Sequence, residues 1–68
     1  MKLYRFLTGP DDASFCHRVT DALNKGWELH GDPQYSYDQS KQAMLCGQAV
    51  VKTVDGKDYT PDLKLSEQ

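Results

Sequence analysis

Residues 22–29, A-L-N-K-G-W-E-L, combine the end of a helix, a glycine and the start of a strand. Gly26 is expected to take the left-handed conformation that ends many helices, because it has no Cβ atom. Trp27 follows directly and is expected to pack back on the last helical turn near Ala22. This stretch therefore predicts a helix before Gly26 and a half-buried strand after it.

The helix before Gly26 is expected to follow a short strand. Lys2 to Thr8 has the alternating apolar pattern of a strand, which Gly9 and Pro10 end. Proline suits the first turn of a helix, and Asp11 and Asp12 complement the positive end of a helix dipole. The sequence thus predicts a helix that starts near Pro10 to Asp12. Its apolar stripe recurs every three or four residues, at Phe15, Val19, Ala22 and Leu23.

Two further strands are predicted after the helix. From Trp27 to Tyr37, apolar and aromatic residues occupy odd positions and polar residues occupy even ones, which is typical of a half-buried strand. Gly31 and Pro33 interrupt this pattern and predict a bulge on an edge strand. Gln42 to Val54 predicts a long strand that is apolar on both faces, as central strands covered on both sides are.

The order strand, helix, strand, strand predicts an α+β fold. We expect a three-stranded sheet of order 1-3-2 with the helix packed on one face. The second and third strands form a hairpin around a polar turn at Asp38 to Lys41, and the first strand runs parallel to the second. Asp55-Gly56 is a turn signal. We therefore expect one β-α-β-β domain over residues 1–56 and a C-terminal arm over residues 57–68, anchored by Leu63 and Leu65.

The hairpin allows two registers. A turn of two or four residues would bring one set of third-strand side chains beside Leu29 and Tyr35: Met44, Cys46 and Val50. A three-residue turn, or a bulge near Gly31, would bring the other set there instead: Leu45, Ala49 and Val51. We favour the second register, which leaves the first set on the sheet face opposite the helix, with Leu3 and Leu7 as neighbours.

This open face leads to the main functional hypothesis. A domain of 68 residues buries only about 60% of the surface that its unfolded chain exposes, and domains this small usually add a disulfide, a metal or a partner. An exposed apolar patch typically marks an interaction surface. We therefore predict a small soluble interaction module that forms a homo-oligomer, most simply a dimer, through Leu3, Leu7, Met44, Cys46 and Val50. The two copies would pack sheet to sheet, or through paired edge strands.

An alternative hypothesis concerns Glu28, His30 and Asp32. Their period-two spacing puts three proton carriers or potential metal ligands on one side of a strand. The polar face of any half-buried strand has the same pattern, and no fourth ligand lies at metal-site spacing. We keep a small-ligand, metal-binding or catalytic site around His30 as the alternative function. We assign no metal site, no cofactor and no catalytic residue, and we favour a role that is not enzymatic.

Cysteine content, charge and hydropathy narrow the class of protein. Cys16 and Cys46 are too few for a secreted disulfide scaffold, and together with His17 and His30 they lack the spacing of a structural zinc site. We expect both thiols to be reduced and buried.

Eight Lys and Arg against ten Asp and Glu give a net charge of -2 without a basic stripe, which disfavours nucleic acid as a partner. Without a signal peptide or an apolar run of spanning length, we expect a cytoplasmic protein with no membrane contact.

Four segments resemble one family of short bacterial proteins, domain of unknown function 1737. They are Y-R-F-L-T-G-P-D-D at Tyr4 to Asp12, A-L-N-K-G-W-E-L at Ala22 to Leu29, C-G-Q-A-V-V-K at Cys46 to Lys52, and D-G-K-D-Y at Asp55 to Tyr59. The second segment is also similar to a related group of small domains with L-x-x-x-G-W-E-L at a helix-to-strand junction, which supports the β-α-β-β order. Because no activity is assigned to the family, the resemblance implies no function and no site residues.

Overall fold

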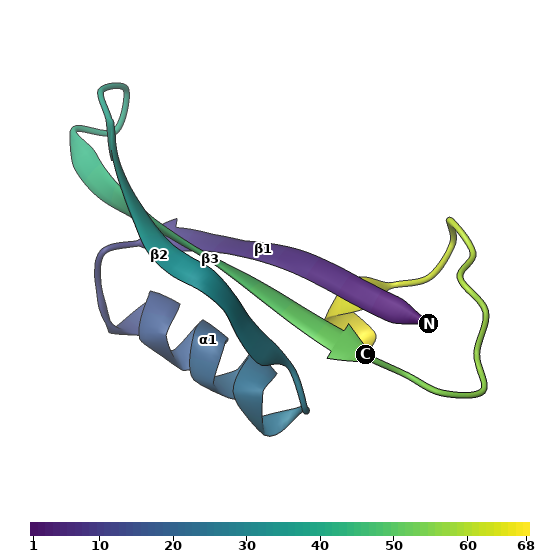
Figure 1. The fold of residues 1–68 in the computed structure, drawn as a ribbon. Helices are drawn as coiled ribbons and strands as arrows, with labels where there is room; N and C mark the ends of the chain where they lie inside the picture. Colours follow the sequence, from purple (N-terminus) through teal and green to yellow (C-terminus); the bar gives the residue numbers. More distant parts are fainter.

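The computed structural model describes residues 1–68 as a small sheet with one helix beside it (Figure 1). Its elements are β1 (Lys2–Pro10), α1 (Ala13–Asn24), β2 (Glu28–Asp38), β3 (Ala43–Thr53) and a 3-10 turn, η1 (Leu65–Glu67). The strand order is β1-β3-β2, and β3 is antiparallel to both neighbours, so β1 and β2 run parallel. The predicted α+β fold, strand order and helix position are confirmed. Neither helical element has the length and apolar character needed to cross a membrane.

Local sequence determines where α1 begins and ends. Asp12 is the N-cap, and its carboxylate accepts a hydrogen bond of 2.8 Å from the backbone N–H two residues later. At the other end, Gly26 has a φ of +96° and donates to the Leu23 carbonyl at 3.2 Å. The Trp27 N–H donates to the Ala22 carbonyl at 3.1 Å. These two bonds form a Schellman motif, which confirms the predicted glycine cap and the return of Trp27 onto the helix. The predicted helix start is slightly early, because the chain up to residue 10 still belongs to β1.

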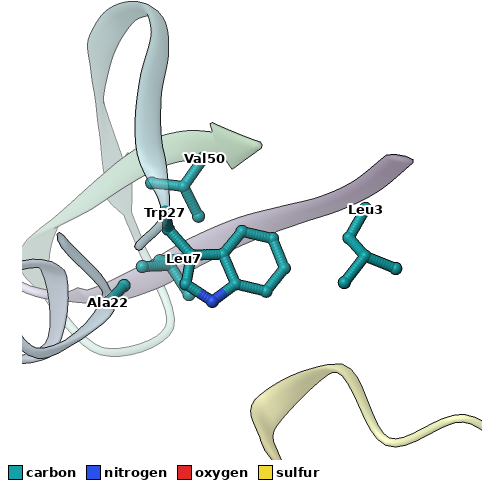
Figure 2. Close-up of a cluster of buried hydrophobic side chains, with 5 residues drawn as sticks. All are labelled: Leu3, Leu7, Ala22, Trp27 and Val50. Carbon is teal, nitrogen blue, oxygen red and sulfur yellow. The ribbon is translucent and has the colours of Figure 1, made fainter. Parts of the chain in front are cut away.

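The core lies on the sheet face that α1 covers (Figure 2). Five buried residues form one cluster: Leu3, Leu7, Ala22, Trp27 and Val50. Phe15 and Val19 of α1 pack against this cluster and remain partly exposed. Leu63 and Leu65 of the C-terminal arm also pack against it, as predicted for the two anchors of the arm. Helix and arm therefore contact the same cluster, on the same face of the sheet.

The favoured hairpin register is wrong. Residues 39–42 connect β2 to β3, which makes a four-residue turn. Odd positions of β2 consequently pair with even positions of β3: Leu29 with Val50, and Tyr35 with Cys46. The structure thus has the other register, with the even-numbered side chains of β3 beside the odd-numbered ones of β2 on the helix side.

The predicted bulge is present, but it does not change which side chains share a face. Residues 31–33 of β2 lie opposite Gln48 alone, between the pairs His30–Ala49 and Gln34–Gly47. Two extra residues leave the alternation intact, because side chains along a strand repeat with period two. The Gln48 amide is buried and donates to the carbonyls of His30 at 3.4 Å and Gly31 at 3.3 Å. It also donates to the Ala49 carbonyl at 2.9 Å, so one buried amide connects the backbone of β3 to the bulge of β2.

The register corrects the predicted interface. Leu3, Leu7 and Val50 are at most 2% exposed and belong to the core of a single chain, and Cys46 is also buried. Met44 is 38% exposed, but its even-numbered position on β3 puts its side chain on the helix side, as for Cys46 and Val50. The prediction that these five residues lie on the open face is therefore wrong. The opposite set of side chains occupies that face: Tyr4, Phe6, Leu45, Ala49 and Val51.

Candidate functional site

The structure does not arrange Glu28, His30 and Asp32 as a metal site. Glu28 and His30 lie on β2 opposite Val51 and Ala49, whereas Asp32 lies within the bulge and pairs with no residue of β3. All three residues are exposed. Across the chain, no group of three His, Cys, Asp or Glu side chains is arranged to hold a metal ion. The bulge therefore takes Asp32 out of the strand pairing that Glu28 and His30 keep.

A polar cluster that the sequence did not reveal lies just before α1. The Asp11 carboxylate accepts hydrogen bonds from the Tyr35 hydroxyl at 3.3 Å and from the Cys46 thiol at 3.7 Å. The negative charge of Asp11 raises the pKa of Tyr35. Burial and then the charge of Asp11 raise the pKa of Cys46. Both groups are therefore protonated at neutral pH and act as donors to the carboxylate.

This cluster borders a shallow pocket of about 180 Å³ between the start of α1 and β2. The pocket is lined by both cysteines, Asp11 and Tyr35 among others. Cys46 is buried, but Cys16 is exposed, which corrects the prediction that both thiols are buried. A thiol with a raised pKa is a weak nucleophile, and the site has no cation or imidazole that would activate it. The cluster ties the loop before α1 to the sheet and offers no evident catalytic chemistry.

The sequence contained one signal for this cluster. Two aspartates, Asp11 and Asp12, precede α1, whereas one carboxylate is sufficient to cap a helix. Asp11, which the cap does not use, was therefore free to bond elsewhere. Its partners, Tyr35 and Cys46, are 24 and 35 residues away in the sequence, and no local pattern connects them.

The sheet face opposite α1 is the most extensive feature without an intramolecular cover. Tyr4 and Phe6 of β1 are 55% and 49% exposed. Two half-buried residues of β3, Val51 and Ala49, pair with them in register. Leu45, also half-buried, lies further along the same face of β3, opposite Pro10. We call these five residues the open-face patch. A shallow pocket of about 230 Å³, lined in part by Phe6 and Leu45, opens next to it.

The centre of the open-face patch depends on a glycine. The Phe6 ring lies directly over Gly47, and a Cβ atom added to Gly47 would lie 2.5 Å from the ring. Any larger residue at this position of β3 would have to displace the ring. Gly47 thus allows the aromatic side chain to lie close to the backbone of the central strand.

A second group of exposed apolar side chains lies on the helix side of the hairpin, where α1 covers the strands incompletely: Leu29, Tyr35, Tyr37 and Met44. The molecule measures 44 × 23 × 19 Å, and the tip of the hairpin extends past the start of α1 (Figure 1). The bulge separates Leu29 from the other three residues. This group is therefore interrupted, whereas the open-face patch crosses adjacent strands without a break.

Comparison with known proteins identifies the family. Neither the curated proteins nor the solved structures contain a match to this chain. The family model described as Domain of unknown function (DUF1737) matches residues 1–53. This range starts before β1 and ends with the last residue of β3, so it contains the whole sheet and α1, and it excludes the C-terminal arm. The chain therefore belongs to the DUF1737 family.

Proposed function

We propose that this protein is a small self-associating module in which the open-face patch binds a second copy of the chain. The observation that carries this proposal is the one-sided cover of the sheet. α1 and the C-terminal arm both pack on the face with the core cluster. A sheet with one polar face is stable in water, but here Tyr4 and Phe6 are exposed on the uncovered face beside half-buried aliphatic residues.

The size of the sheet predicts a weak dimer. β1 and β3 have 9 and 11 residues. With a rise of about 3.3 Å per residue and about 4.8 Å between strands, a three-stranded face measures roughly 30 by 14 Å, or about 400 Å². Two such flat faces bury about 800 Å², without the additional area of the side chains that project from them. This area is below the usual range of stable interfaces. We therefore expect dissociation on dilution, with a Kd on the order of 10–100 µM.

The strand order suggests how two copies would pack. β1 and β2 are the two edges of the sheet, with β3 between them. A two-fold axis parallel to β3 would place β1 of one copy over β2 of the other, with the sheets about 10 Å apart. Phe6 and His30 both pair with Ala49, so this axis would bring them opposite each other across the interface. The exposed polar residues of β2, including Glu28 and His30, would then contact the partner rather than a small ligand.

Light scattering after size exclusion tests this proposal. The wild-type chain is expected to change from monomer to dimer between about 5 and about 500 µM, as mass action requires. Phe6→Asp puts a charge at the centre of the patch and is expected to keep the chain monomeric. Tyr4→Asp serves as a second variant, because Tyr4 lies on the patch and does not cover Gly47.

Tyr37→Asp is the matched control, because Tyr37 is an equally exposed tyrosine on the helix side. We expect this variant to dimerise like the wild type. Circular dichroism of each variant shows whether it is folded. A wild-type chain that stays monomeric throughout the concentration range, or a dimer that Tyr37→Asp disrupts and Tyr4→Asp does not, contradicts the proposal.

A further inference from the structure

The C-terminal arm covers one end of the core without belonging to the family-matched unit. The match ends at residue 53, and residues 54–62 contain neither helix nor strand. Leu63 and Leu65 then pack against the core cluster, and η1 contacts β1. The arm therefore occupies a surface that the sheet and α1 form by themselves.

This surface is built around Trp27 and Leu3, which Figure 2 shows beside the arm. Two cations flank the indole: the Arg5 guanidinium carbon lies 5.6 Å from the ring centroid, and the Lys52 ammonium lies 6.0 Å from it. Both distances fit a cation–π contact. The surface thus combines an apolar floor with positive charge at its rim.

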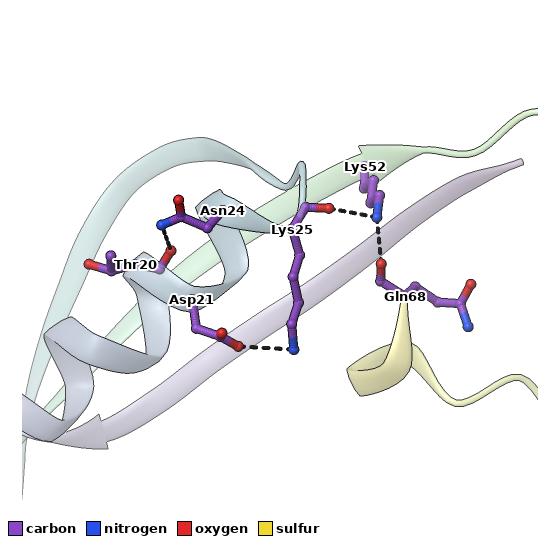
Figure 3. Close-up of polar contacts among 6 residues, drawn as sticks. All are labelled: Thr20, Asp21, Asn24, Lys25, Lys52 and Gln68. Atoms are coloured by element: carbon purple, nitrogen blue, oxygen red, sulfur yellow. Dashed lines mark hydrogen bonds and ion pairs between the residues drawn. The ribbon is translucent and has the colours of Figure 1, made fainter.

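Lys52 links this surface to the arm. Its ammonium donates to the backbone carbonyl of Lys25 at 2.7 Å, next to the end of α1, and also to the main-chain oxygen of Gln68 (Figure 3). One side chain of β3 therefore holds both the helix end and the arm. An ammonium is suited to this role because it has several donors on a flexible stem.

Two observations indicate that the arm is a removable cover. Residues 55–62 are exposed, and Leu63 and Leu65 are the only apolar anchors of the arm that pack on the core. Segments with so few buried contacts open at a small fraction of the global unfolding free energy. In addition, the indole Nε1 of Trp27 is buried without a hydrogen-bond partner. A buried donor without an acceptor costs free energy, which any opening that lets water reach the indole would recover.

We propose that the surface formed by Leu3, Trp27, Arg5 and Lys52 is a binding groove for a Leu-X-Leu segment. In the single chain the groove holds residues 63–65, Leu-Lys-Leu, of its own arm. When the arm opens, the groove accepts the same segment from a second molecule. The arm attached to the same chain has a high effective concentration at the groove. An arm from a second molecule therefore binds only when the attached arm is held less tightly.

Trp27 is the single tryptophan of the chain and reports directly on the groove. In the wild-type chain we expect blue-shifted emission and little quenching by acrylamide. In the double variant Leu63→Ser, Leu65→Ser we expect a red shift and several-fold stronger quenching with the circular dichroism of a folded protein. Tyr59→Ser is the matched control, because Tyr59 lies in the same arm but is 66% exposed, and its emission should equal that of the wild type.

A peptide of residues 57–68 contains no tryptophan and provides the test in trans. Added to the double variant, it should restore the blue-shifted emission in a saturable manner, whereas the same peptide with serine at both leucine positions should not. Emission in the folded double variant that matches the wild type, or no response to the leucine peptide, overturns the proposal.

Hydrogen exchange in the wild-type chain provides a second measurement that does not depend on folding of the double variant. If the arm opens on its own, the Trp27 indole N–H should be protected at least about tenfold less than the backbone amide of Val50 in the central strand, each relative to its own intrinsic exchange rate. Equal protection would mean that the groove opens only on global unfolding, and the proposal would then be wrong. Neither measurement depends on dimer formation through the open-face patch.

Discussion

The two faces of the sheet have similar side chains and very different surroundings. Val50 and Val51 are neighbours on β3, yet Val50 is completely buried under α1 while Val51 is half-buried on the open face. The same contrast separates Leu3 from Tyr4 on β1. Helix and arm both lie on one face, so one layer of side chains forms the core and the other forms a surface. An apolar strand therefore does not reveal by itself which of its faces is the core.

The largest expected effect comes from shortening a side chain on the sheet face that α1 covers. Leu7→Ala should lower the free energy of unfolding by about 2–5 kcal/mol, because it removes a buried leucine and leaves a cavity. Tyr4→Ala, on the open face of the same strand, should change it by less than about 1 kcal/mol at concentrations where the chain is monomeric. Urea unfolding at micromolar concentration measures both values. Equal losses for the two variants would remove the distinction between the faces.

A smaller effect is expected at Gly47, where the Phe6 ring of the open face lies against the backbone of β3. Gly47→Ala should cost about 1 kcal/mol, because its Cβ atom would displace the end of the Phe6 ring. In a Phe6→Ala background the same substitution should cost little, since the displaced ring is absent. A double-mutant cycle in urea measures this coupling. Additive losses would show that the ring does not lie on Gly47.

The smallest effect is the pH dependence of stability caused by Cys46, the buried thiol on the face that α1 covers. The folded chain raises the pKa of Cys46 above its ordinary value of 9.0, mainly through burial and then through Asp11. Because the pKa of the thiol is higher in the folded chain than in the unfolded chain, the protonated thiol contributes to stability in full below pH 9.0. This contribution is lost as the pH rises through the folded pKa. Stability should therefore fall above pH 9.0, and less steeply in Cys46→Ala.

Cys16→Ala is the control for this pH dependence, because Cys16 is exposed. Its stability measured between pH 7 and pH 10 by urea unfolding should follow the wild-type curve. A Cys46→Ala variant with an unchanged alkaline slope would indicate that the thiol is not protected by the core. Some slope should remain in that variant, because the pKa of Tyr35 is also raised above its ordinary value of 10.0.

The polar cluster and the open-face patch differ in how far the sequence predicted them. The uncovered apolar face was expected from the two-sided pattern of β3, but its residues were assigned to the wrong set. The cluster of Asp11, Tyr35 and Cys46 was not expected, because its members come from a loop and two strands. Glu28, His30 and Asp32 had a regular spacing that the bulge then interrupted.

The sequence by itself determined the elements, their order and the ends of α1. Asp12 and Gly26 act on backbone groups within a few residues, so their effects can be recognised locally. Only the tertiary structure decided which side of each strand is buried, because a single residue added to a turn or bulge exchanges the two faces. It also decided where the arm packs, since Leu63 and Leu65 contact a core formed by residues far away in the chain. These choices depend on the total apolar surface buried by the whole molecule, which no short segment contains.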